Sequence, residues 1–135
     1  MTKLVRVQVE NLTVEQLQWL QKYARDAWDK ADFRDILRQA REQLLALWEL
    51  EDSPAKGIVG TKIFEGKRGR MLWLEFLVGE GLLADAIAIR LAIHEVRKLA
   101  ECSSLEGIVS RPGLARLYER VLGVKPSAQI FREEF

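Results

Sequence analysis

Histidine and cysteine, the side chains that most often carry acid–base, nucleophilic or zinc chemistry, each occur once here, as His94 and Cys102. His94 lies four positions after Arg90 and three before Arg97. On a helix this spacing predicts a polar stripe, and a catalytic histidine is the less favoured interpretation. Cys102 would react only where its thiolate is favoured, so a packed or idle thiol is the simpler interpretation. We expect neither a metal site nor a disulfide bond.

Cations gather in the segment GKRGR, which contains Lys67, Arg68 and Arg70. Its glycines predict a tight turn between two strands, so the three charges would stand on one hairpin turn. Such a turn could contact phosphate groups or an acidic protein partner, or it could simply keep the hairpin soluble. Nucleic-acid contact is open but not indicated, because the net charge is only +1.

Tryptophan is frequent for a chain of this size, and Trp19 and Trp28 fall on one amphipathic segment. Exposed tryptophan is enriched at protein interfaces. Trp19 and Trp28 are therefore candidates for binding another protein chain, with packing in the core as an equal alternative.

The length and composition of the chain limit the classes of protein to which it can belong. A length of 135 residues favours one domain over 1–135, and 48% hydrophobic with 30% charged residues is a normal globular balance. No apolar run approaches the ~20 residues of a membrane span, and the first residues have no apolar leader. We expect a protein without membrane contact, located in the cytoplasm or in a particle assembled inside a cell.

Hydrophobic periodicity and turn residues predict the order of elements. Strands are predicted over 3–12, 43–52, 57–66, 71–81, 104–110 and 128–135, and helices over 13–29, 33–42, 83–100 and 111–123. Thr13 and Gln16 predict a capping box at the first helix, and Asp32 caps the second. Short turns in the middle predict an antiparallel meander, and the buried strand over 104–110 is expected to run parallel to the strand before the long helix.

This order, β-α-α-β-β-β-α-β-α-β, resembles that of the GNAT acyltransferases. The family's last motif, N-x-x-A-x-x-L-Y followed by glycine and phenylalanine, is similar to the segment with Ala115, Leu117, Tyr118 and Gly123. AKGIVGT also looks like the opening of one of the family's strands. The resemblance covers 43–135, and 1–42 by element order only. It implies an α+β fold with a GNAT-like mixed, mainly antiparallel sheet flanked by helices.

For an active enzyme, the resemblance implies acetyl-CoA as the cofactor and Tyr118 as the acid that protonates the leaving thiolate. It implies Glu75, in the strand segment LWLEFL, as the general base. The alternatives are a tyrosine with its hydroxyl at the surface and a solvated carboxylate on the open face of the sheet.

The family's cofactor loop, (Q/R)-x-x-G-x-(G/A), lies before the central helix, whose free N–H groups hold the pyrophosphate. Here the chain reads LVGEGLLADA over 77–86. Binding would fall to the backbone of Gly79, Gly81, Leu82, Leu83 and Ala84. No Lys, Arg or Gln lies between residues 76 and 89. Glu80 and Asp85 are interpreted as helix caps that would oppose a polyanion.

These observations predict first a non-catalytic GNAT-like protein without a cofactor. Small proteins of this kind with a degenerate loop look like those that tailed bacteriophages encode, so the expected role is a structural virion component that binds other protein chains, found in the virion or the host cytoplasm. The alternative is an acetyl-CoA-dependent N-acyltransferase acting on an amine. A third interpretation is a small-ligand sensor that keeps the family's cleft without catalysis.

Overall fold

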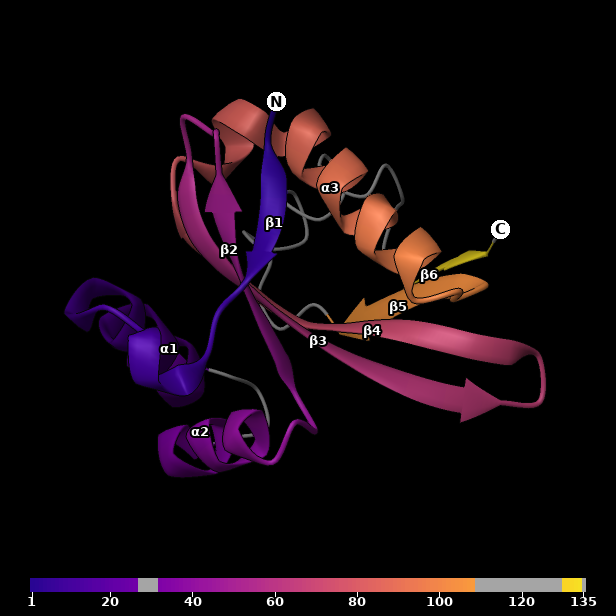
Figure 1. The fold of residues 1–135 in the computed structure, drawn as a ribbon, viewed down its shortest axis with the longest axis horizontal. Coiled ribbons are helices and arrows are strands. Elements are labelled where there is room, and N and C mark those ends of the chain that lie inside the picture. The colour runs from indigo at the N-terminus through magenta and orange to yellow at the C-terminus, as the bar shows by residue number, and fades with distance from the viewer. Residues whose placement is uncertain (27–31, 109–129, 135) are drawn as a thin grey trace.

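The computed structural model describes residues 1–26, 32–108 and 130–134 (Figure 1). The strands are β1 Lys3–Arg6, β2 Ala46–Glu51, β3 Lys56–Gly66, β4 Gly69–Glu80, β5 Ser104–Ile108 and β6 Ile130–Glu134. The helices are α1 Val14–Asp26, α2 Phe33–Arg41 and α3 Ala86–Leu99, with 3₁₀ turns η1 Val9–Asn11 and η2 Leu82–Asp85. Trp28 and the predicted helix over 111–123, with Tyr118, lie outside the described residues.

The described strands form one six-stranded sheet in chain order, β1-β2-β3-β4-β5-β6. Every neighbouring pair is antiparallel except β4 and β5, which are parallel because α3 crosses from the end of one to the start of the other. The predicted α+β class, the meander and the single parallel pair are all confirmed.

Local sequence signals account for the helix starts. The backbone N–H of Thr13 donates to Gln16 Oε1 at 3.0 Å and that of Gln16 donates to Thr13 Oγ1 at 3.1 Å, which is the predicted capping box. The Asp32 carboxylate accepts from the backbone N–H of Arg34 at 2.9 Å, also as predicted.

Several predicted boundaries were wrong, each for a local reason. The first strand ends at Arg6 because the chain turns into η1 from Val9. The second strand begins only at Ala46, because Gln43 takes a left-handed φ of 60° and the next residue, Leu44, donates its N–H back to the carbonyl of Gln39, closing α2.

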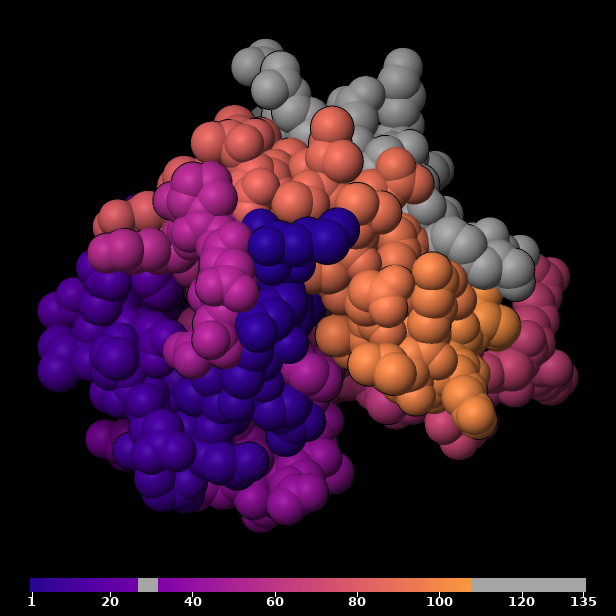
Figure 2. Space-filling model, turned by 45° about the horizontal axis from the view of Figure 1, so that its top comes forward, coloured from indigo at the N-terminus to yellow at the C-terminus, as the bar shows by residue number. Residues whose placement is uncertain are grey.

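Helices cover both faces of the sheet (Figure 1). On one face, α1 and α2 pack on a buried cluster that includes Leu20, Ile36 and Phe76. On the other face, α3 packs on a second cluster, which includes Leu72 and Leu74. β1 also contacts α3, and Figure 2 shows the first residues against this helix. No helix in the described part of the chain is both long and apolar enough to span a membrane.

Candidate active site

The parallel strands β4 and β5 separate half-way along β4. Their register runs from Met71 opposite Ser104 to Leu74 opposite Gly107 and then ends. β4 continues to Glu80, still paired with β3 on its other edge. Among the described strands, none pairs with the β5-facing edge of β4 from residue 75 to 80.

A β-bulge marks the point of separation. Gly60 on β3 lies opposite Phe76 and Thr61 lies opposite Leu74, which leaves Glu75 as the extra residue on β4. The bulge also shifts the alternation of side chains. Leu74 and Leu77 both join the cluster under α3, whereas Phe76 joins the cluster under α1 and α2.

Glu75 is held in place by its neighbours on the α1 side. Its Oε2 accepts from Trp73 Nε1 at 2.7 Å, and its Oε1 lies 3.8 Å from Lys62 Nζ. The Tyr23 hydroxyl of α1 donates to its backbone carbonyl at 3.1 Å. Its side chain is 26% exposed, so the carboxylate is partly shielded and keeps some contact with solvent.

A second carboxylate, Glu106 on β5, was missed by the sequence analysis. It is buried, at 9% exposure, and its register partner on β4 is Trp73. Leu105 next to it is fully buried in the cluster under α3, so by strand alternation Glu106 faces the same side as Glu75. The signal was present in the sequence, as the lone charge in the segment LEGIV.

The loop between β4 and α3 differs from the prediction in where the helix begins. Gly81 takes a left-handed φ of 70°, the 3₁₀ turn η2 covers Leu82–Asp85, and α3 starts at Ala86 rather than at 83. Among the predicted cofactor-binding residues, Leu82 is buried, whereas Gly81, Leu83 and Ala84 are exposed. Gly79 lets β4 pass close to β3, because a Cβ at this position would lie 2.0 Å from the carbonyl oxygen of Lys56.

The two acidic residues of this loop are not the helix caps that the sequence suggested. Asp85 occupies the N-cap position but makes no capping hydrogen bond. Its Oδ2 accepts instead from the hydroxyls of Thr2 and Ser53, at 2.5 Å each. Glu80 is the exposed last residue of β4, opposite Lys56 in the register. The first-turn N–H groups of α3 are therefore not occupied by either carboxylate.

A hollow of about 510 Å³ lies over this start of α3. It is bordered by residues of η2 and the first turns of α3, among them Leu83, Ala84, Ile87 and Leu91. The family's loop pattern, (Q/R)-x-x-G-x-(G/A), can be aligned so that it ends at Ala86, the first residue of α3. Gly81 then takes the first position, and the small residues Ala84 and Ala86 take the last two. Ala86 is 6% exposed and packs in the cluster under α3, whereas Ala84 is exposed. Small residues there let a ligand approach the backbone closely.

His94 and Cys102 lie away from this opening and are both packed inside. His94 is 8% exposed and its Nδ1 accepts from Arg97 Nε at 3.4 Å, so it shares a helix face with Arg97 as predicted but is buried. Burial raises the pKa of the Cys102 thiol, and the nearby Arg70 and Arg97 only partly offset this. Cys102 is thus a packed thiol, as predicted. Within the described ranges, no three potential metal ligands come together.

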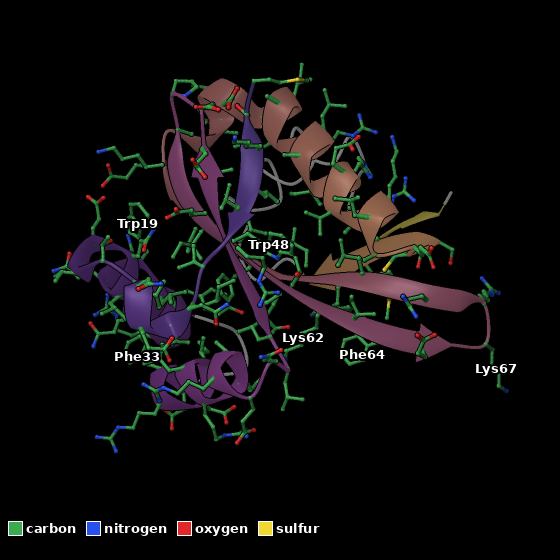
Figure 3. The ribbon with its side chains drawn as sticks, viewed as in Figure 1. Trp19, Phe33, Trp48, Lys62, Phe64 and Lys67 are labelled. Atoms are coloured by element: carbon green, nitrogen blue, oxygen red, sulfur yellow. The ribbon has the colours of Figure 1, made fainter. Side chains whose placement is uncertain are left out.

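The described members of the predicted partner-binding set lie on α1 and on the β3–β4 hairpin. Trp19 is half-buried and packs on the cluster under α1 and α2. Lys67 lies at the end of the β3–β4 hairpin, pointing away from the sheet (Figure 3), and Arg68 is exposed beside it. Arg70 turns back, donating to Glu65 at 2.8 Å and to the carbonyl of Ala100 at 2.9 Å. The expectation of three cations together on one turn was therefore wrong.

Comparison with known proteins gives no matching family model and no matching curated protein. Solved structures do match. An aminoglycoside acetyltransferase, AAC(6')-Ib, in complex with coenzyme A and kanamycin superposes with a TM-score of 0.64 at 12% identity, over 99% of this chain and 95% of the other. A putative acetyltransferase of the GNAT family from Desulfovibrio desulfuricans gives a TM-score of 0.58 at 13% identity, over 99% of both chains.

A third match is a mutant of the AtaT toxin bound to the C-terminus of the antitoxin AtaR, with a TM-score of 0.58 at 13% identity, over 99% of this chain and 92% of the other. The chain therefore has the fold of the GNAT acetyltransferases, as its element order predicted. At these identities the likeness establishes the fold alone.

Proposed function

We propose that this protein is an acyl-CoA-dependent N-acyltransferase, with acetyl-CoA as the simplest donor, and that the donor enters the opening between β4 and β5. One observation carries the proposal. β4 separates from β5 at a bulge, and Glu75 is the extra residue of that bulge. Beyond the bulge β4 continues to the loop before α3. No acidic side chain of this loop caps the N–H groups at the start of α3. An open strand edge, a positioned carboxylate and a free helix N-terminus are the parts that this chemistry requires.

The donor would be bound mainly by backbone groups of the protein and less by side chains. The open edge of β4 over 75–80 offers N–H and C=O groups to amides of an extended ligand. Ala84, which is small and exposed, allows the pyrophosphate to approach the start of α3. Asp85 is directed to the hydroxyls of Thr2 and Ser53. The exposed Glu80 opposes an anion, so we expect weak binding, with a dissociation constant of roughly 100 µM.

Glu75 is the group that would accept a proton from the acceptor amine. Acetyl-CoA would supply the acyl group as a thioester and leave as the coenzyme A thiol. Lys62 and Trp73 fix the Glu75 carboxylate on the α1 side of the sheet. Glu106 lies buried on the same side of the sheet, beside the strand register position of Trp73. Tyr118, as the donor of a proton to the leaving thiolate, remains a prediction.

Calorimetric titration of acetyl-CoA at low salt tests the proposal. The wild-type protein should bind, and Ala84→Glu, which adds a carboxylate at the exposed loop, should bind at least tenfold more weakly. Gln18→Glu adds the same charge on the exposed face of α1 and should leave binding unchanged. No heat of binding up to millimolar acetyl-CoA would contradict the proposal.

A second function, the non-catalytic protein-binding role, is favoured by one specific observation. The loop has no basic side chain between residues 76 and 89, and Leu83, Ile87 and Leu91 are 50%, 73% and 49% exposed around the hollow. Exposed aliphatic side chains suit a protein partner better than a pyrophosphate. In that case the protein would be a structural component, and the specific proposal is that it is a component of a phage virion. Failure of the acetyl-CoA titration would favour it.

A further inference from the structure

A second hollow, of about 500 Å³, lies away from the β4–β5 opening, under the last turn of α3. Trp48 and Leu72 of the sheet line it, together with Val96, Leu99 and Ala100 at the end of α3. It shares no lining residue with the hollow at the start of the same helix. Its volume is in the range of small-molecule binding pockets, and its lining is mainly apolar, as theirs is.

Exposed aliphatic residues surround the mouth of this second hollow. Leu44, Ile63 and Leu99 are 58%, 52% and 83% exposed, and all three border it. They come from three separate parts of the chain: the connection after α2, strand β3 and helix α3. Large apolar side chains that converge on one hollow while facing water mark a surface that binds an apolar ligand.

The hollow also carries a positive charge in a fixed place. The Arg6 guanidinium lies over the Trp48 ring, 5.2 Å from its centroid. The Trp48 indole is held in turn, because its Nε1 donates to Thr61 Oγ1 at 2.9 Å. Figure 3 shows Trp48 near the middle of the fold, between the sheet and α3.

Among the described residues, no acidic side chain lines the second hollow. Lys62 also borders it, but its ammonium is engaged with Glu75 at 3.8 Å. No described carboxylate pairs with Arg6, whose guanidinium is held by the Trp48 ring alone. An apolar cavity with one unneutralised guanidinium at its mouth is complementary to an anion that carries a hydrocarbon body, since the planar guanidinium matches a carboxylate.

We propose that this second hollow binds an amphipathic carboxylate of the fatty-acid class. The carboxylate pairs with Arg6, and the hydrocarbon chain lies along Trp48 and Leu72 toward Val96. The site is independent of acyl transfer at the β4–β5 opening, so the two proposals stand or fall separately.

Titration with decanoate, followed by nuclear magnetic resonance of the tryptophan indole N–H groups, tests this site. The Trp48 signal should move in a saturable way at concentrations below those of micelles. The Trp73 signal should stay, because that indole donates to Glu75 on the other face of the sheet. Hexanoate should bind at least tenfold more weakly, since each methylene fully buried is worth about fourfold in affinity.

Two variants and one control test the role of charge. Arg6→Gln should weaken decanoate binding at least fivefold, and Leu99→Glu, at a position 83% exposed, should weaken it at least tenfold by placing a carboxylate at the mouth. Lys98→Gln removes a cation from the neighbouring exposed position and should have no effect. Decyltrimethylammonium should not bind. An unmoved Trp48 signal, equal binding of this cation, or movement of every indole together would overturn the proposal.

Discussion

The two halves of β4 both contribute buried apolar side chains but differ in how their edges are paired. From Gly69 to Leu74 the strand pairs with β3, and from Met71 to Leu74 it also pairs with β5; its buried leucines pack under α3. From Glu75 to Glu80 it is paired only with β3 and begins with a bulge. Phe76 and Leu77 of the second half are as buried as the leucines of the first, so the halves differ in edge pairing and not in burial. The pairing with β5 therefore ends at the point where β4 has one extra residue, Glu75.

The largest effect is expected in the paired half. Leu74 is 1% exposed in the cluster under α3, so Leu74→Ala should lower the free energy of unfolding by about 3 kcal/mol. Denaturant unfolding measures it. In the open half, Val78→Ala, at a half-buried position, should cost about 1 kcal/mol. Equal losses at the two positions would contradict the division of β4.

The open half should instead control activity. Glu75→Gln keeps the shape of the side chain but cannot accept a proton, so acetyl transfer to an amine should fall about 100-fold. The free energy of unfolding should change by less than about 0.5 kcal/mol. Glu51→Gln, on the exposed end of β2, is the matched control and should leave the rate unchanged. An unchanged rate in Glu75→Gln would remove this carboxylate from the chemistry.

The bulge itself can be disturbed from the opposite strand. A Cβ at Gly60 would lie 2.3 Å from Phe76 Cε2, so Gly60→Ala should destabilise the protein by about 2 kcal/mol. Shortening the facing ring with Phe76→Leu in the double variant should recover part of the loss caused by Gly60→Ala. Strict additivity of the two substitutions in denaturant unfolding would show that the contact does not limit packing there.

Cys102 lies just before β5, so the reactivity of its thiol measures how often the region around the β4–β5 pair opens. Because burial raises the pKa of its thiol above the ordinary 9.0, alkylation at pH 8 should be at least tenfold slower in the native than in the unfolded protein. The sign of the pH dependence follows from the same shift. The thiol supports folding below its ordinary pKa, and that support is lost as the pH rises through the raised value. Equal alkylation rates would show that this region opens freely.

The smallest effects are expected at the two acidic residues of the loop. Glu80→Gln should tighten acetyl-CoA binding about threefold, because it removes an exposed charge next to the binding path. Asp85→Asn should change binding less than twofold, since its carboxylate faces Thr2 and Ser53, and should cost about 1 kcal/mol of stability. Calorimetry compares the two variants, and the reverse ranking would contradict the placement of these charges.

Local signals in the sequence were sufficient for much of the fold. The capping box of Thr13 and Gln16 depends on residues three positions apart and was predictable for that reason. The parallel pairing of β5 with β4 followed from an apolar segment after a long helix, since a crossover helix requires it.

The details that define the candidate site depend on contacts that a single sequence does not display. The bulge at Glu75 lies in a strand that is buried on both faces, so no break in alternation marks it. The 3₁₀ turn over Leu82–Asp85 has the same residue preferences as the first turn of a helix. Asp85 finds its partners 83 and 32 positions away, at Thr2 and Ser53, beyond any local pattern.

The central claim is that acyl-CoA binds along the open half of β4, and backbone amide resonances test it most directly. On addition of acetyl-CoA, we predict that the amide signals of residues 75–80 and 84–86 shift with a common dissociation constant, while those of 69–74 stay in place. Shifts confined to other elements, or none up to millimolar acetyl-CoA, would contradict the claim and leave the protein-binding role as the better account.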